Sequence, residues 1–511
     1  MSSSSLLVRE ARLTAALALP LIAGQINQML ITLTDTLMIG RLGVVPLAAA
    51  TFTNTLLYLP FVVGIGLALA VSLRVARARG AGDRASARSA LRHGLWLAVG
   101  AGVLSILAAW LVQPLFPYFR QEKEVIDAVP AYFHLIAASM LPAMAALAVK
   151  SHSDAMNHPW PAFWVTTGGV LLNVGLNWLL IFGHWGAPAM GLEGAGLATL
   201  LAQIATLGGL LVLSNRNPAL RGWVPRNWFE KFDGAAVREL LRIGLPTSLQ
   251  LLAEVSAFVV TTCLIGTMGT QALASHQVAI SCAGTIFMVP LGISMALTVR
   301  VGEALGAGER IRIRPIVLTG WILASAFTLI SAQAFLLLNR PIAGWFLSEP
   351  KALALTAGLL LVAAAFQLGD ALQVVSAGAL RGLNDVRTPA WIAVLAYWLV
   401  SLPLGWWLAM PRGWGVAGMW WGITAGITFT ALALGRRTWR MTSPGYLNVA
   451  GPGLSRRILK QSAGFKRLQV TLHRGSQETL AIAGKPVGAP KCASQAPGDA
   501  VLALNPKLLS S

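Results

Sequence analysis

The chain has 511 residues, of which 56% are hydrophobic and only 11% are charged. Soluble domains carry about 25% charged residues, so this composition excludes an ordinary soluble protein and requires lipid as the surrounding solvent. The net charge of +20 is not arranged in an interleaved basic and aromatic stripe, so we expect no nucleic-acid partner.

Twelve apolar stretches of about 20 residues are long enough to cross a bilayer as α-helices. The first continues past the length of a signal peptide, so we expect it to be retained. The sequence therefore predicts an all-α integral membrane protein. The twelve expected spans are 13–38, 46–72, 93–115, 129–149, 161–183, 191–213, 242–266, 272–299, 315–338, 353–378, 389–410 and 414–435.

Lysine and arginine are distributed unevenly between the loops. With both termini on the cytoplasmic side, the cytoplasmic segments up to residue 440 hold 24 of them and the opposite loops hold six; the other nine follow residue 440. Cytoplasmic loops of membrane proteins carry such an excess of positive charge. We therefore expect both termini to be cytoplasmic, in a bacterial-type inner (cytoplasmic) membrane.

The chain repeats itself with an offset of 226 residues. The segment RVARARGAGD at 74–83 aligns without a gap with RVGEALGAGE at 300–309, and the same offset pairs the Leu-Pro dipeptides at 19–20 and 245–246. Six spans are followed by six similar spans that enter from the same side. This pattern predicts two pseudo-symmetric six-helix lobes, related as parallel repeats around a central cavity, as in transporters that work by alternating access.

The spans and the repeat together predict the domain organisation. The tail lacks a long apolar run, so we expect a disordered cytoplasmic extension whose basic residues can contact anionic lipid. Three widely spaced cysteines suggest neither a disulfide framework nor a metal site. The expected parts are a cytoplasmic N-terminus (1–12), the N-lobe (13–214), a cytoplasmic linker (215–241), the C-lobe (242–435) and a basic tail (436–511).

Three carboxylates lie well inside the expected spans: Asp35, Glu254 and Asp370. No lysine or arginine lies comparably deep. An acid in a membrane helix costs roughly 2.5–3.5 kcal/mol even on the mildest scale, so such residues face a cavity or the bundle interior and mark function. By the repeat, Glu254 corresponds to Gln28, seven residues before Asp35, which places acids on equivalent faces of the two lobes at different depths.

Polar and aromatic residues accompany these acids. Asn173 and Asn177 are one helical turn apart, and their oxygens can join Asp35 in holding a hard cation; alternatively, they hold helices together. Phe258 lies one turn from Glu254, where its ring suits a cation or simply faces lipid.

On the expected span 353–378, Phe366, Asp370 and Gln373 share one side of the helix. Gln277 is a further polar residue inside a span. For its neighbour His276, a structural role with satisfied hydrogen bonds is favoured over a titrating role.

Several motifs occur in order along residues 10–435: DTLMIGRLG, the basic GAGD loop, a Leu-Pro dipeptide followed by Glu254, LASHQVA, and FQLGDALQVVSAGALRGLNDVRTP. Together they resemble the multidrug and toxic compound extrusion (MATE) family. The pair Glu254 and Asp370 resembles its NorM-type branch rather than its DinF-type branch. The resemblance implies twelve helices in two lobes and the export of organic cations in exchange for Na⁺ or H⁺.

The resemblance also implies roles for single residues. One departure is that Phe366 stands where NorM-type members often have a tyrosine, so a hydroxyl ligand is missing there. Na⁺ is then expected either at the C-lobe pair or at the N-lobe set. The matching residues are Asp35, Asn173 and Asn177 for the N-lobe polar site, Glu254 and Asp370 for the C-lobe cation site, and Phe258 and Gln277 for contacts with the cation or substrate. Phe366 is a further expected contact with the cation or substrate.

A secondary antiporter is therefore the expected function, because a proton, Na⁺ and a cationic drug can compete for one carboxylate. The alternative is a flippase of lipid or lipid-linked precursors with the same two-lobe fold, but basic residues would then line its cavity. No HExxH, GxSxG or paired GxGD motif points to an enzyme. We expect no cofactor beyond the coupling ion, no obligate protein partner, and a monomer in the bilayer.

Overall fold

A computed structural model of the chain describes residues 3–119, 122–230, 232–443 and 445–446. Within these ranges the chain is helical and contains no β-strand, and twelve helical segments are long and apolar enough to cross a membrane. The prediction of an all-α integral membrane protein with twelve spans is confirmed. Most of the expected basic tail, from residue 447, lies outside the described residues.

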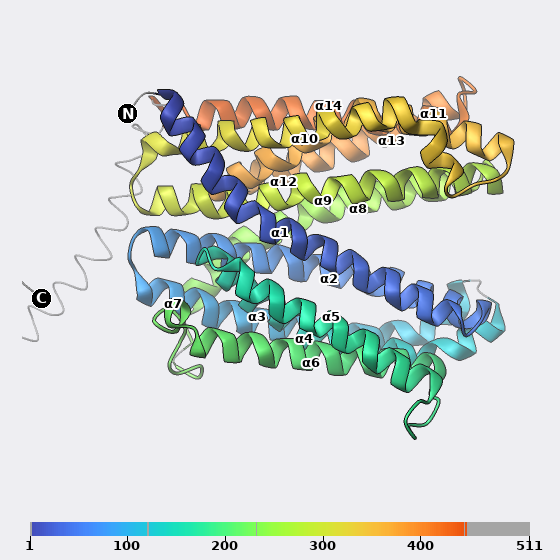
Figure 1. The fold of residues 1–511 in the computed structure, drawn as a ribbon, viewed down its shortest axis with the longest axis horizontal. Helices are drawn as coiled ribbons and strands as arrows, with labels where there is room; N and C mark the ends of the chain where they lie inside the picture. The colour runs from blue at the N-terminus through green and yellow to red at the C-terminus, as the bar shows by residue number, and fades with distance from the viewer. Residues whose placement is uncertain (1–2, 120–121, 231, 444, 447–511) are drawn as a thin grey trace, which may run out of the picture. The chain divides into compact units, whose positions relative to one another are not determined.

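The first six spans form the N-lobe (Figure 1). A 3₁₀ helix, η1 (Gln113–Phe119), extends α3, and a one-turn helix, α7 (Pro218–Arg221), follows the sixth span. The six long helices are α1 (Ser3–Gly40), α2 (Val44–Gly80), α3 (Arg84–Val112), α4 (Lys123–Ala155), α5 (Pro159–Phe182) and α6 (Gly191–Arg216).

The second six spans form the C-lobe. Its fifth span is interrupted by a π-helical turn, η2, which precedes Pro403; proline lacks the N–H that would continue the regular ladder. The helices are α8 (Gly234–Gly266), α9 (Thr270–Gly306), α10 (Arg310–Gly344), α11 (Pro350–Gly382), α12 (Arg387–Val394), η2 (Leu395–Ser401), α13 (Leu402–Ala409) and α14 (Gly415–Met441).

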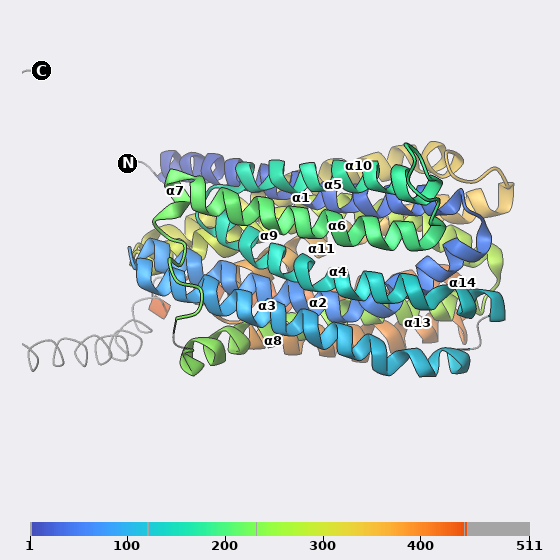
Figure 2. The same cartoon turned by 90° about the horizontal axis from the view of Figure 1, so that it is seen from below.

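The two lobes have the same internal arrangement. In the N-lobe α4 is central and contacts α2, α3 and α6, and in the C-lobe the equivalent helix α11 contacts α9, α10 and α14 (Figures 1 and 2). The turns also repeat. Gly43 (φ 120°) and Gly269 (φ 115°) precede α2 and α9, and Gly82 (φ 69°) and Gly308 (φ 76°) follow them. Glycine adopts such positive φ angles without strain, so the repeat is confirmed in the backbone.

Several helices are longer than hydropathy predicts. The second span was expected to end at residue 72, but α2 continues to Gly80 through Arg74, Arg77 and Arg79. These arginines lower the hydropathy of the segment without disfavouring a helix, because arginine is a good helix former. This long helix therefore carries its three arginines beyond the apolar span.

The lobes meet closely where α2 ends beside α9. A Cβ atom placed on Gly80 would lie 2.0 Å from the carbonyl oxygen of Glu303, and one placed on Gly306 would lie 2.1 Å from the carbonyl oxygen of Arg77. Real Cβ atoms do not approach oxygen so closely, so only glycine permits this crossing. Gly80 and Gly306 are 226 residues apart, and the contact is therefore symmetric between the repeats.

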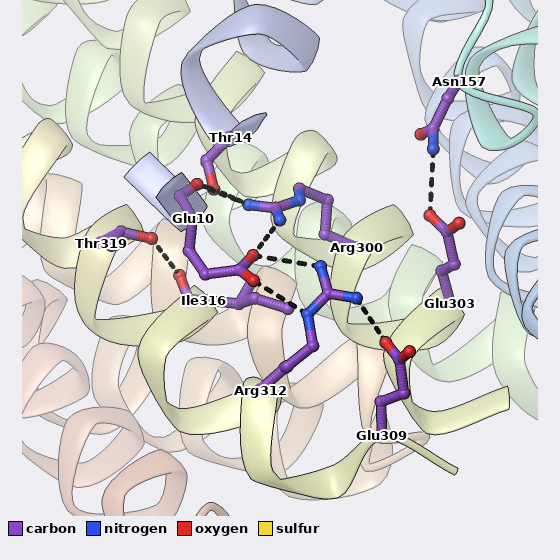
Figure 3. A network of polar contacts seen from close by, with 9 residues as sticks. All are labelled: Glu10, Thr14, Asn157, Arg300, Glu303, Glu309, Arg312, Ile316 and Thr319. Carbon is purple, nitrogen blue, oxygen red and sulfur yellow. Dashed lines mark hydrogen bonds and ion pairs between the residues drawn. The ribbon is translucent and has the colours of Figure 1, made fainter. Parts of the chain in front are cut away.

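A buried ionic network ties α1 to the C-lobe at the same end of the molecule (Figure 3). Glu10 is fully buried. It accepts hydrogen bonds from Arg300 of α9 and from Arg312 of α10, the latter from Nε to Oε1 at 2.8 Å. Asn157, between α4 and α5, donates to Glu303 of α9 at 3.0 Å. The first helix of the N-terminal repeat is thus anchored on the C-lobe.

Candidate functional site

The polar residues of the N-lobe are joined by a series of side-chain hydrogen bonds. Asn177 Nδ2 donates to Asp35 Oδ1 at 2.6 Å and to Asn173 Oδ1 at 3.2 Å. Asn173 in turn donates to the hydroxyl of Thr199 at 3.4 Å. The asparagines are one turn apart on α5, as their spacing requires, and both are buried, while Asp35 on α1 is partly exposed. These hydrogen bonds therefore connect α1, α5 and α6.

One side-chain oxygen in this N-lobe site is unsatisfied. The side-chain oxygen of Asn177 is buried and has no hydrogen-bond donor among the described residues. Buried polar atoms in proteins are nearly always satisfied, so a buried oxygen without a donor indicates a place for a proton donor or a cation. This oxygen belongs to the same side-chain amide whose nitrogen donates to Asp35.

The C-lobe carboxylates also lie together, although they come from different helices. Gln373 Nε2 is 3.3 Å from Glu254 Oε1 and 3.1 Å from Asp370 Oδ1, and donates to both. Glu254 lies on α8, and Asp370 and Gln373 lie one turn apart on α11. The fold thus places one amide between two acids that are 116 positions apart in the sequence.

Two members of these sites, Thr199 and Tyr397, are not predicted from the sequence. Thr199 is one of many hydroxyl residues in the spans, and nothing in its neighbourhood marks it. Tyr397 is fully buried in η2, and its hydroxyl accepts a hydrogen bond from Gln373 Nε2 at 2.8 Å. The available signal is a single tyrosine in the middle of an apolar span, but the tryptophan-rich stretch that follows it makes it look like one more aromatic residue of the membrane interface.

The three other predicted residues, Phe258, Phe366 and Gln277, lie in different surroundings. The ring centroid of Phe258 lies 6.2 Å from that of Tyr397, and Phe258 is one helical turn from Glu254. Phe366 is buried and packs against Trp420, with the two ring centroids 5.7 Å apart. Gln277 is exposed on α9, and its side chain forms no hydrogen bond with a described residue. Cation or substrate contact by these three residues stays a prediction.

His276 has both ring nitrogens occupied. Its Nδ1 accepts a hydrogen bond from Trp420 Nε1 at 3.1 Å, so the proton is on Nε2, which lies 2.9 Å from the hydroxyl of Thr262. That hydroxyl donates onward to the carbonyl of Phe258. The neutral tautomer is therefore fixed by its partners, in agreement with the expected structural role.

None of the ion pairs among the described residues involves Asp35, Glu254 or Asp370. All three carboxylates are partly exposed, and their polar partners are side-chain amides. Carboxylate, amide and hydroxyl oxygens form a donor set for a hard cation or a proton. The chemistry of both sites is therefore acidic and oxygen-rich.

The MatE family model matches residues 20–179 and 246–407, two segments whose starts are again 226 residues apart. A probable multidrug resistance protein NorM of Rhizobium meliloti is 35% identical over 437 residues, covering 84% of this chain and 93% of that protein. The corresponding protein of Bradyrhizobium diazoefficiens is 36% identical over 417 residues, covering 81% and 90%.

Solved structures share the fold. A mutant of the Vibrio cholerae MATE transporter VcmN superposes with a TM-score of 0.79 at 22% identity, covering 87% of this chain and 99% of that one. A transporter from Pyrococcus furiosus, described as having a binding pocket of reverse polarity, superposes with a TM-score of 0.78 at 19% identity, covering 88% and 99%.

Proposed function

Because this chain belongs to the MATE family, in its NorM-type branch, we propose that it is a secondary active antiporter that exports organic cations in exchange for Na⁺ or H⁺. The printed names of the NorM relatives, probable multidrug resistance proteins, support drugs as the exported cations. The two-lobe fold supports alternating access by rocking of one lobe against the other.

The observation that carries this proposal is the pair of acidic sites without a basic partner among the described residues. Asp35 is held by Asn177, and Glu254 and Asp370 are joined by Gln373. Each site offers negative charge to whatever cation enters it. A proton or Na⁺ bound there must leave before an organic cation can pair with the same charge, and this competition is the basis of exchange.

The driving force follows from the membrane potential. An ion that moves inward gains about 2.3 kcal/mol per elementary charge per 100 mV. One inward ion therefore offsets the outward movement of one monovalent cation, and any concentration gradient of the ion adds to this. The coupling sites we propose are Asp35 with Asn173 and Asn177, and Glu254 with Asp370.

The cellular setting is part of the same proposal. The charge distribution supports insertion in a bacterial-type inner membrane with both termini cytoplasmic. The repeat supports an N-lobe over 13–214 and a C-lobe over 242–435, with the cytoplasmic linker 215–241 between them. The last helix, α14, continues to Met441, so the tail expected over 436–511 starts after that residue. A monomer is sufficient for this mechanism, because both acidic sites are built from one chain.

Counterflow in proteoliposomes tests the function. The purified full chain is reconstituted, a fluorescent organic cation is loaded, and Na⁺ and pH gradients are imposed separately. We expect uphill movement of the cation with one of the two gradients and none in vesicles that contain the variant Glu254→Gln with Asp370→Asn. Movement of a labelled lipid between leaflets, without movement of the cation, would identify a flippase instead.

A further inference from the structure

Part of the linker between the lobes lies along the N-terminal half of α3. Residues 222–230 and 232–233 follow α7 and lead into α8 (Figure 2). Four polar contacts, each from a different α3 side chain, hold this part of the linker on the N-lobe. They are the hydrogen bond from Arg88 to the carbonyl oxygen of Gly222 at 2.8 Å, the ion pair of Arg92 with Glu230, the hydrogen bond from the backbone N–H of Asp233 to His93 Nε2 at 3.0 Å, and the hydrogen bond from Trp96 Nε1 to the carbonyl oxygen of Trp228 at 3.3 Å.

This part of the linker has a buried side and an exposed side. Val224 is buried, and Trp228 packs against the same hydrophobic cluster of the N-lobe. Phe229 and Phe232, which we call the aromatic pair, are instead exposed, with exposed fractions of 83% and 74%. Apolar side chains that the fold holds together on the outside of a protein indicate a surface that contacts another molecule.

The aromatic pair lies near the membrane boundary. Residues 84–93 of α3 contain three arginines and a histidine, whereas residues 94–112 contain no charged residue. At 1.5 Å per residue the uncharged part is about 28 Å long, and the hydrocarbon core of a bilayer is about 30 Å thick. Trp96 and Trp110 lie near its two ends, and tryptophan is enriched at both membrane–water interfaces. The hydrocarbon core therefore begins near Trp96, which contacts the linker.

The aromatic pair also continues the lipid-facing side of α3. The exposed apolar residues of the uncharged part follow one another at spacings of three, four and seven, so they share one face of the helix. They are Trp96, Val103, Leu104, Leu107, Trp110 and Leu111. The ring of Phe229 packs edge-on against that of Trp96, with centroids 5.8 Å apart, and the ring of Phe232 packs against that of His93 at 6.0 Å. Phe229 therefore extends the lipid-facing strip at the end where hydrocarbon meets the headgroups.

From this arrangement we propose that the aromatic pair is a lipid anchor: Phe229 and Phe232 insert between phospholipids at the boundary of headgroups and acyl chains, and fix the inter-lobe linker to the membrane surface beside α3. In the proposed topology this is the cytoplasmic leaflet. The anchor goes beyond the antiport function and does not depend on it. Its consequence is that the linker stays with the N-lobe when the lobes move, because α3 covers one side of it and lipid covers the other.

Collisions of spin labels with a water-soluble nickel complex, nickel ethylenediaminediacetate, test the anchor in proteoliposomes. The labels are attached to the full chain through Phe229→Cys and Phe232→Cys, after the three native cysteines are replaced by serine. Leu104→Cys, in the exposed strip of α3, is the lipid control, and Ala81→Cys, exposed between α2 and α3, is the water control. We expect the nickel complex to collide with the labels at 229 and 232 several-fold less often than with the label at 81.

Photolabelling of the unsubstituted chain gives a second readout, which needs no replacement of the aromatic pair. The liposomes contain a phosphatidylcholine with a diazirine on an acyl chain, close to the ester carbonyl. Trypsin then separates the two phenylalanines into the peptides 227–231 and 232–238. We expect lipid adducts in both, as in the α3 peptide 93–120, and none in the peptide 80–84, which precedes α3.

Two results would overturn the anchor. One is equal access of the nickel complex to the labels at 229, 232 and 81, and the other is the absence of adducts from both linker peptides while the peptide 93–120 is labelled. Either result would mean that the aromatic pair faces water, where a soluble protein could bind it instead. Neither measurement uses transport, so failure of the counterflow experiment would count against the antiport function and leave this test unaffected.

Discussion

Gly80 of α2 and Gly306 of α9 are equivalent residues of the two repeats, and each faces the backbone of the other's helix at the point where the lobes cross. Neither position has room for a side chain. The crossing lies near the buried network of Glu10, Arg300 and Arg312, so one end of the interface between the lobes is both close-packed and ionic.

Replacement of either glycine should open this end of the molecule. In Gly80→Ala or Gly306→Ala, the new Cβ would fall about 2 Å from a carbonyl oxygen, so the lobes must separate there. Spin labels at Ala81 and Ala307, which are also equivalent, should show a longer and broader distance distribution. Gly100→Ala and Gly358→Ala, where a Cβ meets nothing within 4 Å, are the controls. An unchanged distribution in both test variants would show that the crossing adapts without separation.

The charge of Glu10 should matter for stability. Glu10→Gln leaves Arg300 and Arg312 without their shared counterion, and loss of one partner from a buried ion pair costs about 3–5 kcal/mol. We expect a clear drop in the thermal unfolding midpoint in detergent. Glu309→Gln, which removes a half-exposed partner of Arg312, should change it little, because exposed ion pairs contribute about 0–1 kcal/mol. Equal effects of the two changes would contradict the buried network.

Removal of the charge of Asp35 should abolish transport without unfolding the protein. Asp35→Asn keeps an oxygen that can accept the hydrogen bond from Asn177, but it can hold neither a proton nor a cation by charge. Two unit charges 4 Å apart attract by about 4 kcal/mol near a protein surface, so we expect the export rate to fall by tenfold or more. Drug resistance of cells is the measurement, with exposed Asp127→Asn as control. Full resistance with Asp35→Asn would mean that this acid is structural.

Glu254 and Asp370 should act as one unit, because Gln373 joins them. Glu254→Gln and Asp370→Asn should each weaken transport strongly, and the double variant should be little worse than the worse single one. Binding of an organic cation should release protons into weakly buffered solution. Multiplicative losses in the double variant, together with the absence of proton release, would assign the two acids separate tasks.

Both termini should be cytoplasmic. A fluorescent protein that is inactive in the periplasm, fused after the end of α14 at Met441, should glow, because 24 of the 30 basic residues before that point lie on the same side. A periplasm-active enzyme fused at the same position should be silent. The opposite pair of results, at normal expression, would reverse the topology.

The sequence alone determined the twelve spans, the repeat and the three acids, because these depend on local composition and on matches at a fixed offset. The apolar stretches predicted helices wherever lipid must surround the backbone, and Asp35, Glu254 and Asp370 were recognisable because charge is rare in such stretches. Asn173 and Asn177 were paired correctly, since residues four apart share a helix face.

Only the tertiary structure decided which of these residues meet. Gln373 joins Glu254 to Asp370 across two helices, and Tyr397 completes the group from a π-helical turn that no propensity or hydropathy pattern marks. The contacts of Glu10 with Arg300 and Arg312 span about 300 residues of sequence. Such contacts depend on how rigid helices pack against one another, and a single sequence records the periodicity of each helix but not the register between helices.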